Sequence, residues 1–306
     1  MKKTMALIKR NLLLYFKNKQ SVFFSLLTSI LVFGLYLLFL KGNYVTALNN
    51  VVEQNPGLKG LITDGDINAF SNMIMLVGVL GAALVTVPFH CLSTAVNDRE
   101  RKIDYDISAT PIKRWQIVVS YFVSAAISSI IMISVILTLG LVVLKAMGGL
   151  YLTTKGIAAA YGVIVLGSIS GTAFFMPIIL LYKDGTSLGA FFGIISAVSG
   201  FVIGAYIPLS EFSEGIRNVC GLFPGAHITS LLRVALTGDV LNKMDAQIGG
   251  LDQGMFVSSI KTVFPFETFA FGRNFDTKLM IIYIFGMLAL CIALMILVYA
   301  KNYKRK

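Results

Sequence analysis

Charged residues are absent from six long stretches of this chain, and their absence excludes a soluble globular protein. No Asp, Glu, Lys or Arg occurs in the ranges 21–40, 70–96, 116–144, 157–182, 186–207 and 279–300. A helix needs about 20 apolar residues to cross a hydrocarbon core of about 30 Å. Only 13% of the residues are charged, about half the share in soluble domains. We predict an all-α membrane protein, 1–306, in which these six ranges are transmembrane helices.

The first apolar range lacks the pattern of a cleavable signal. The apolar part of a secretory signal peptide is about 7–15 residues long and ends at a small-residue cleavage site. Range 21–40 is longer and leads into Lys41 without such a site. We interpret this range as a retained first span.

Basic residues are unevenly divided between the two sides that the spans define. With a cytoplasmic N-terminus, the inner segments are 1–20, 97–115, 183–185 and 301–306, and the outer segments are 41–69, 145–156 and 208–278. The inner segments carry 16 Lys/Arg and 5 Asp/Glu, and the outer segments carry 10 of each. This asymmetry predicts that both termini are cytoplasmic. The net charge of +11 therefore reflects orientation against membrane lipid and does not indicate a nucleic-acid partner.

Signatures of catalysis and nucleotide binding are missing as well. The chain has no G-x-x-x-x-G-K-[ST] phosphate loop, and His90 is the only ionisable residue in the spans apart from Tyr and Cys. His90 and Cys91 alone cannot complete a tetrahedral metal site. Cys91 and Cys291 fall in spans and Cys220 does not, which argues against a disulfide framework. We predict no catalytic residue, no metal and no cofactor on this chain. If the chain is a transporter, we expect its energy to come from another polypeptide.

Residues 1–20 predict a helix that lies along the membrane surface. Lys3, Arg10 and Lys17 recur every seven residues, and apolar side chains occupy another face. The alternative is a basic flank that only fixes the orientation of the first span.

The inner segment, defined as residues 97–115, is the most highly charged part of the chain. It carries both signs of charge, then the Thr110-Pro111 stop and the interfacial Trp115. We predict a short helix parallel to the membrane that presents both signs of charge to a soluble partner. The alternative is a solvated loop whose basic residues only orient the protein.

The fifth predicted span carries a glycine stripe, a set of small residues at spacings of three or four. Its members are Gly185, Gly189, Gly193, Ala197, Gly200 and Gly204. Such a stripe lets a second helix approach closely. Two interpretations stay open, a subunit interface along a central path and packing within the chain.

The outer segment 208–278 is long, and stretches such as 215–237 are too apolar for an ordinary exposed loop. Phe223-Pro224-Gly225 interrupts that stretch. We predict paired short helices that dip into the outer leaflet. The alternative is a small packed cap domain, which residues 239–276 would form.

With these features in this order, the chain resembles the membrane subunit of type-2 ABC exporters. The resemblance covers nearly the whole chain and depends on the order of degenerate motifs: Arg99-Glu100 through Thr110-Pro111 and Arg114, then Pro208-Leu209-Ser210, Phe223-Pro224 and Leu232-Arg233. Lys102-Ile103 stands where the family often has Gly-Thr, and Phe223 replaces the usual asparagine.

The resemblance implies a dimer, either homo- or heterodimer, of such permease chains in a bacterial plasma membrane. Two copies of a separate ATP-binding cassette ATPase subunit would bind ATP and Mg, and their closure would drive transport outward. A charge-free path lined by Phe191, Phe192 and Phe201 favours an amphiphilic substrate, either a drug-like compound, a lipid or a hydrophobic peptide. Three groups of site residues follow by resemblance. ATPase coupling falls to Arg99, Glu100, Arg101, Asp104, Asp106, Thr110, Pro111 and Arg114. The dimer interface and path fall to Gly185, Gly189, Gly193, Gly200, Gly204 and Phe192. The outer gate falls to Pro208, Pro224 and Arg233.

Two other functions stay open. One is a permease for polysaccharide or teichoic-type chains, which a wide aromatic-lined channel and a much shorter outer segment would favour. The other is a receptor or immunity protein that binds its target without transport. A requirement for ATP turnover by a partner separates transport from such binding.

Overall fold

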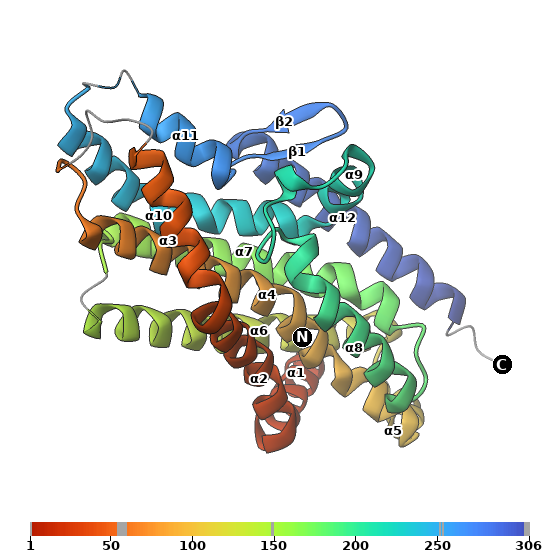
Figure 1. Cartoon of the computed structure of the whole chain (residues 1–306). Helices are drawn as coiled ribbons and strands as arrows, with labels where there is room; N and C mark the ends of the chain where they lie inside the picture. Colours follow the sequence, from red (N-terminus) through yellow and green to blue (C-terminus); the bar gives the residue numbers. More distant parts are fainter. Residues whose placement is uncertain (1, 54–59, 148–149, 251, 253, 303–306) are drawn as a thin grey trace.

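The protein is a bundle of helices with one small hairpin (Figure 1). The computed structural model describes residues 2–53, 60–147, 150–250, 252 and 254–302. In chain order, the elements are α1 (Lys2–Lys17), α2 (Lys19–Leu35), a π-helical turn (Tyr36–Leu40), α3 (Lys41–Glu53), α4 (Asp64–Glu100), α5 (Ile103–Ala109), α6 (Arg114–Ala146), α7 (Thr154–Ile179), α8 (Gly185–Val202), a 3-10 turn (Leu209–Glu211), α9 (Glu214–Leu222), α10 (Pro224–Ile248), α11 (Met255–Val263), β1 (Thr268–Ala270), β2 (Arg273–Phe275) and α12 (Thr277–Asn302).

Five helices, α4, α6, α7, α8 and α12, are each long and apolar enough to cross a membrane. Up to seven spans result if each of two bent helix pairs is one span. The chain is therefore a multi-pass membrane protein. The five helices coincide with the second to sixth predicted spans, with shifted ends. Range 21–40 is divided between α2 and the π-helical turn, so the total of six spans stays a prediction.

The predicted outer loop 41–69 is partly helical. The π-helical turn leads into α3 without a break, because the Lys41 N–H donates to the Tyr36 carbonyl. Leu48 and Val51 of α3 are buried, and residues three apart on a helix share a face. These buried contacts explain why the chain stays helical beyond residue 40, the end of the charge-free range 21–40.

The fifth predicted span, 186–207, ends earlier than expected. Helix α8 stops at Val202, and Gly204 adopts a left-handed conformation with φ +68°. The Ala205 N–H then donates to the Gly200 carbonyl at 2.8 Å. This glycine-based helix end explains why an apolar sequence does not stay helical.

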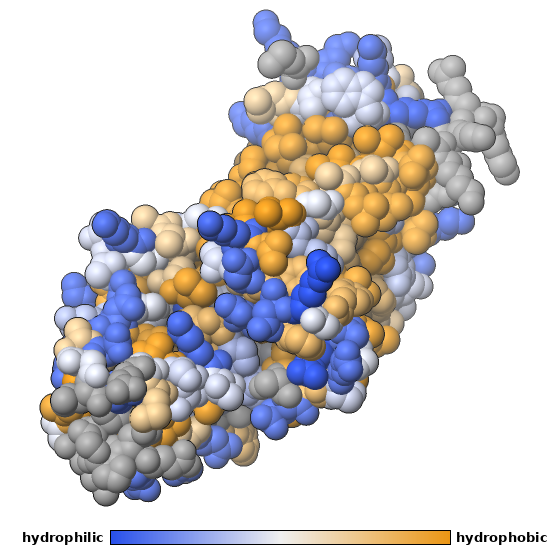
Figure 2. All heavy atoms as spheres, turned by 90° about the horizontal axis from the view of Figure 1, so that it is seen from above, coloured by the Kyte–Doolittle hydropathy of each residue, from blue (hydrophilic) through white to orange (hydrophobic). Residues whose placement is uncertain are grey.

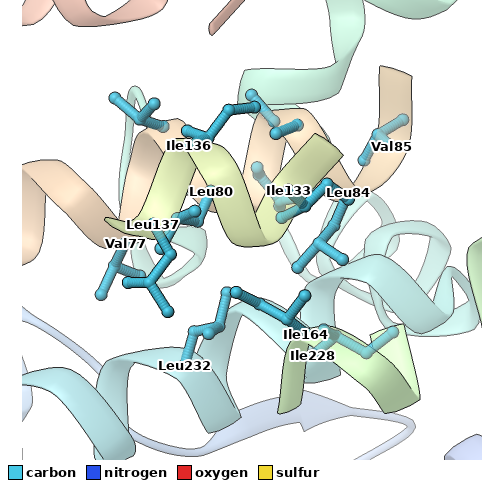
Figure 3. Close-up of a cluster of buried hydrophobic side chains, with 14 of the residues drawn as sticks. Val77, Leu80, Leu84, Val85, Ile133, Ile136, Leu137, Ile164, Ile228 and Leu232 are labelled. Atoms are coloured by element: carbon cyan, nitrogen blue, oxygen red, sulfur yellow. The ribbon is translucent and has the colours of Figure 1, made fainter. Parts of the chain in front are cut away.

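Helix α4 is the centre of the bundle. It packs against α2, α6, α7, α8 and α10, and nearly all its residues between Asp66 and Phe89 are buried. A helix that is apolar on every side is stable only when neighbours surround it. Figure 3 shows part of this core, with side chains from four helices: Val77, Leu80, Leu84 and Val85 of α4, Ile133, Ile136 and Leu137 of α6, Ile164 of α7, and Ile228 and Leu232 of α10.

The outer surface of the bundle is apolar between two polar ends. In Figure 2 a continuous hydrophobic area separates polar residues at the two ends of the molecule. Exposed Leu139 and Val142 on α6, and Ile282 and Leu297 on α12, belong to such surface. This distribution is typical of a lipid-facing protein.

The outer segment 208–278 has a bent helix pair, but the second helix is not short. Helices α9 and α10 meet at an angle of 87° around Phe223, and α10 has 25 residues. A cap domain of residues 239–276 would begin inside a helix, because α10 continues to Ile248. Its buried side chains Leu236, Val240, Met244 and Ile248 follow at intervals of four, which is the repeat of a helix face.

Helix α10 begins at about the middle of the bundle. Thr229, in its second turn, leaves no room for a Cβ at Gly81 of α4 (2.7 Å). Gly81 lies about midway along the charge-free part of α4. Further along α10, Lys243 pairs with Asp66 at the outer end of α4 (2.8 Å). This register runs α10 from mid-depth towards the outer end.

Candidate functional site

The inner segment, 97–115, contains one short helix, α5. It begins after Lys102, which has φ 60°, and it ends where both the N–H and the hydroxyl of Thr110 donate to the Ile107 carbonyl (3.2 and 2.6 Å). Pro111 follows and cannot continue the helix. The orientation of α5 relative to a membrane surface stays a prediction.

Most of the predicted coupling residues in this segment face outward. Exposed positions are Arg101, Asp106, Thr110, Pro111 and Arg114. Tyr105 is 71% exposed and Trp115 is 58% exposed, so two large aromatic rings stand among the charges. Asp104 is half-buried, and this burial raises the pKa of its carboxyl group. The exposed set combines both charge signs with aromatic area, a composition suited to contact with another protein.

Arg99 and Glu100 bind the connection between α7 and α8. The Arg99 guanidinium donates to the carbonyls of Leu180 and Tyr182 (2.9 Å each), at the end of α7. The Glu100 carboxylate accepts the N–H of Gly185 (3.1 Å), at the start of α8. These two residues therefore join the inner end of α4 to two other helices.

Asp98 forms a second connection that the sequence analysis missed. Its carboxylate accepts two hydrogen bonds from Arg10 of α1 (2.7 and 2.9 Å) and one from the Tyr121 hydroxyl of α6 (2.6 Å). Asp98 is buried, at 3% exposed. A buried carboxylate requires a partner, but Arg10 lies 88 residues away in the sequence, so no local pattern identifies it.

The glycines of the stripe have three different surroundings in the structure. A Cβ at Gly200 would lie 2.2 Å from the Tyr206 ring, and one at Gly204 would lie 2.9 Å from Leu209. Both glycines thus make room for their own chain. A Cβ added at Gly189 or Gly193 would have no neighbouring atom within 4 Å, and both glycines are exposed. Gly185 differs from both groups, because it lies next to Glu100.

Phe192 packs inward and does not lie on open surface. Its ring centroid is 4.0 Å from that of His90 and 5.3 Å from that of Phe89. In the described part of the chain, the buried His90 Nε2 atom has no hydrogen-bond partner. A search of the described residues finds no group of three or more His, Cys, Asp or Glu that could hold a metal ion.

Two of the three predicted outer-gate residues come together in a small pocket. The outer pocket is lined by Tyr44, Ile74, Val77, Gly78, Gly204, Ala205, Pro208, Arg233, Phe264 and Pro265. Pro208 and Arg233 thus share one site. Pro224 does not line it and occupies the first turn of α10. Tyr44 was not predicted; its hydroxyl donates to the Ala205 carbonyl (3.0 Å).

A larger apolar groove lies between α2, α4 and α6. Its lining includes Phe33 of α2, Leu76 of α4 and Leu139 of α6, and it encloses about 740 Å³ of empty space that is partly open to the surroundings. Its lining carries no charged side chain, so it offers apolar contact and no site for an ion.

The chain matches a known protein family over most of its length. Residues 45–300 match the sequence profile of a family described as ABC-2 family transporter protein. A comparison with curated proteins gave no match. The matched range contains α4 to α11 and most of α12, and therefore the inner segment, α8 and all residues of the outer pocket except Tyr44.

Proposed function

This chain belongs to the ABC-2 transporter family, and from that membership we propose that it is the permease of an ATP-driven exporter for amphiphilic molecules. As a family member it is a multi-pass ABC transporter permease, a transport subunit and not an enzyme by itself. The proposal adds the direction of transport, the substrate class and the source of energy.

The proposed assembly has two permease chains and two ATP-binding cassette subunits. ATP and Mg bind to the ATPase subunits, and this chain contributes the membrane path. The second permease chain is either a copy of this one or a sister chain. The complex lies in a bacterial plasma membrane, with both termini of the permease in the cytoplasm.

The observation that carries the proposal is the set of contacts at the inner end of α4. Asp98 binds α1 and α6, whereas Arg99 and Glu100 bind the α7–α8 connection. Helix α5 follows at once and presents exposed charges. A force on α5 would therefore reach four helices besides α4 through direct contacts, which is the property that coupling to an ATPase requires.

The outer segment favours an amphiphile over a long sugar chain. The outer segment contains α9, α10, α11 and the hairpin. Helix α11 packs on α3, whereas α9 and the hairpin lie along the side of the bundle near the start of α12 (Figure 1). A much shorter outer segment was the feature expected of a polysaccharide permease. The apolar groove between α2, α4 and α6 also suits the tail of an amphiphile.

The first test is mild-detergent purification of the chain expressed with its genomic neighbours, followed by native mass determination. A complex of two permeases and two ATP-binding subunits is expected. Recovery of this chain alone, under conditions where other membrane complexes survive, would instead favour the receptor or immunity function.

Replacement of Glu100 tests the coupling role. Glu100→Ala should lower ATP-dependent transport about fivefold, equivalent to about 1 kcal/mol of coupling free energy, because the link to α8 is lost. Membrane insertion should stay normal. Glu100→Gln retains an oxygen that can accept the Gly185 N–H and should have a smaller effect. Exposed Glu211→Ala, at the outer end, is the control, and unchanged transport in Glu100→Ala would contradict the assignment.

A further inference from the structure

Arg233 is a buried cation in the outer half of the bundle. It is 8% exposed and lies on α10 one turn beyond Thr229, which contacts the middle of α4. Charged side chains at such depth are costly and mark functional sites more often than packing sites. A physical reason is therefore needed for a guanidinium at this position.

The hydrogen bonds of Arg233 do not supply that reason. Its Nη1 donates to the Pro265 carbonyl, and its Nε is buried without a partner among the described residues. Among the residues that the structure describes, the ion pairs join Arg10 to Asp98 and Lys243 to Asp66. Arg233 thus has no carboxylate partner among those residues.

A purely structural role explains these facts poorly. One backbone carbonyl needs only one donor, which a neutral side chain can supply without burial of a charge. A buried charge without a counter-charge costs several kcal/mol. Lys243 lies ten residues further along the same helix and has its counter-charge in Asp66, so the helix satisfies one cation and leaves the other free to pair.

The outer pocket next to Arg233 restricts what can pair with it. No lining residue is acidic, and the lining combines aromatic and aliphatic side chains with Gly78, Gly204 and Ala205. The enclosed part has room for about one water molecule. It can therefore admit one charged oxygen of a headgroup, while the rest of the molecule stays outside.

We propose that Arg233 binds the anionic headgroup, a phosphate or a carboxylate, of the amphiphile that the permease moves. The Nε of Arg233, which has no partner among the described residues, can donate a charge-assisted hydrogen bond to such an oxygen. This inference rests on the proposed function and narrows its substrate class to amphiphiles with a negative headgroup. The headgroup would supply the negative charge that no described residue supplies to Arg233.

The test is equilibrium binding to the full chain in nanodiscs of zwitterionic lipid. The probes are hexadecyl phosphate and hexadecanoate, with hexadecanol as the uncharged analogue and inorganic phosphate as the free anion. The wild type should bind both anionic amphiphiles at least about tenfold more tightly than hexadecanol, the effect of a charge-assisted hydrogen bond. Equal binding of hexadecyl phosphate and hexadecanol would overturn the proposal, and so would inorganic phosphate that binds as tightly as hexadecyl phosphate.

Variants assign the effect to Arg233. Arg233→Gln should remove the preference for anions and leave hexadecanol binding unchanged, whereas Lys243→Gln should retain the preference. If Arg233→Gln does not fold, Gly78→Val keeps the guanidinium and fills the pocket from α4, and it should weaken anion binding by about the same factor. A preference that survives in both pocket variants would refute the site.

The outcome separates this inference from the proposed function. A chain that prefers anionic amphiphiles through Arg233 but never recruits an ATP-binding subunit would retain the site and lose the exporter. A chain that forms the four-subunit complex and shows no preference dependent on Arg233 would retain the exporter and lose the site.

Discussion

At the scale of single residues, the Asp98 carboxylate accepts three hydrogen bonds from side chains of two other helices. Asp98 lies at the inner end of α4, and it connects this helix with α1 through Arg10 and with α6 through Tyr121. Burial of this carboxylate is tolerated because two donors of Arg10 and the Tyr121 hydroxyl all point to it. The same contacts hold α1 against the bundle.

Removal of the carboxylate should destabilise the protein strongly. Asp98→Ala leaves Arg10 and Tyr121 without their acceptor and should lower the free energy of unfolding by about 3 kcal/mol, the low end for a buried pair because Arg10 is partly exposed. Tyr121→Phe removes one hydrogen bond and should cost about 1 kcal/mol. Thermal unfolding of the purified chain measures both.

Asp106→Ala is the matched control for these variants. Asp106 lies on the exposed side of α5, and surface substitutions of this kind change stability by about 0.5 kcal/mol or less. If Asp98→Ala and Asp106→Ala unfold at the same temperature, the contacts of Asp98 contribute little.

At the scale of elements, α8 combines an inward face and an open face. Phe192 packs on α4, whereas Gly189 and Gly193 form part of the exposed side. A Cβ at Gly193 would have no atom of its own chain within 4 Å outside the helix backbone around it. Any effect of such a change on assembly therefore comes from another molecule.

Gly193→Leu is expected to convert the proposed permease dimer to a monomer or to lower the affinity between the two permease chains at least about tenfold, since close helix approach depends on small residues. Native mass determination in mild detergent measures the ratio of the two forms. Gly286→Leu on α12 is the control, because Gly286 is exposed and also has no atom within 4 Å of a built Cβ. A dimer that persists in Gly193→Leu, at the abundance seen in Gly286→Leu, would assign the open glycines to lipid contact.

The elements differ in how far the sequence could predict them. The helices α4, α6, α7, α8 and α12 were predictable because long charge-free ranges have few other solutions in a membrane. The end of α10 was not, because Asp239 and Lys243 look like the start of a polar domain. Their partners are Thr153 at the start of α7 and Asp66 of α4, and tertiary contacts of this kind have no local signal.

The site was predictable to a smaller extent than the fold. The inner segment and Arg233 were identified from charge and motif order. The exposure of the inner segment and the burial of Arg233 could not be predicted in the same way. Two glycines of the stripe pack against their own chain, because the chain turns back at Gly204 and brings Tyr206 onto Gly200. A spacing of four residues indicates a helix face but does not identify the partner of that face.

At the scale of the whole molecule, the two ends of α4 are tied to different sets of helices. The outer end contacts α10 through Asp66 and Lys243, and the inner end contacts α1, α6 and the α7–α8 connection. The positive-inside distribution predicts that the inner end is cytoplasmic.

Labelling of single cysteines tests this orientation. In a variant without the three buried native cysteines, Ser258→Cys on α11 should react with a membrane-impermeant maleimide added to intact cells. Ser108→Cys on α5 should react only after permeabilisation. Both serines are exposed. The opposite pattern would reverse the topology.

The length of α4 has a mechanical consequence. Its 37 residues at about 1.5 Å each make a rod about 55 Å long, which exceeds a hydrocarbon core of about 30 Å. If the rod pivots near its inner end, a tilt of about 5° moves its outer end by about 5 Å. A small angular step at the cytoplasmic face would then be amplified, without any relay of side chains, into a displacement as wide as a helix turn beside Asp66.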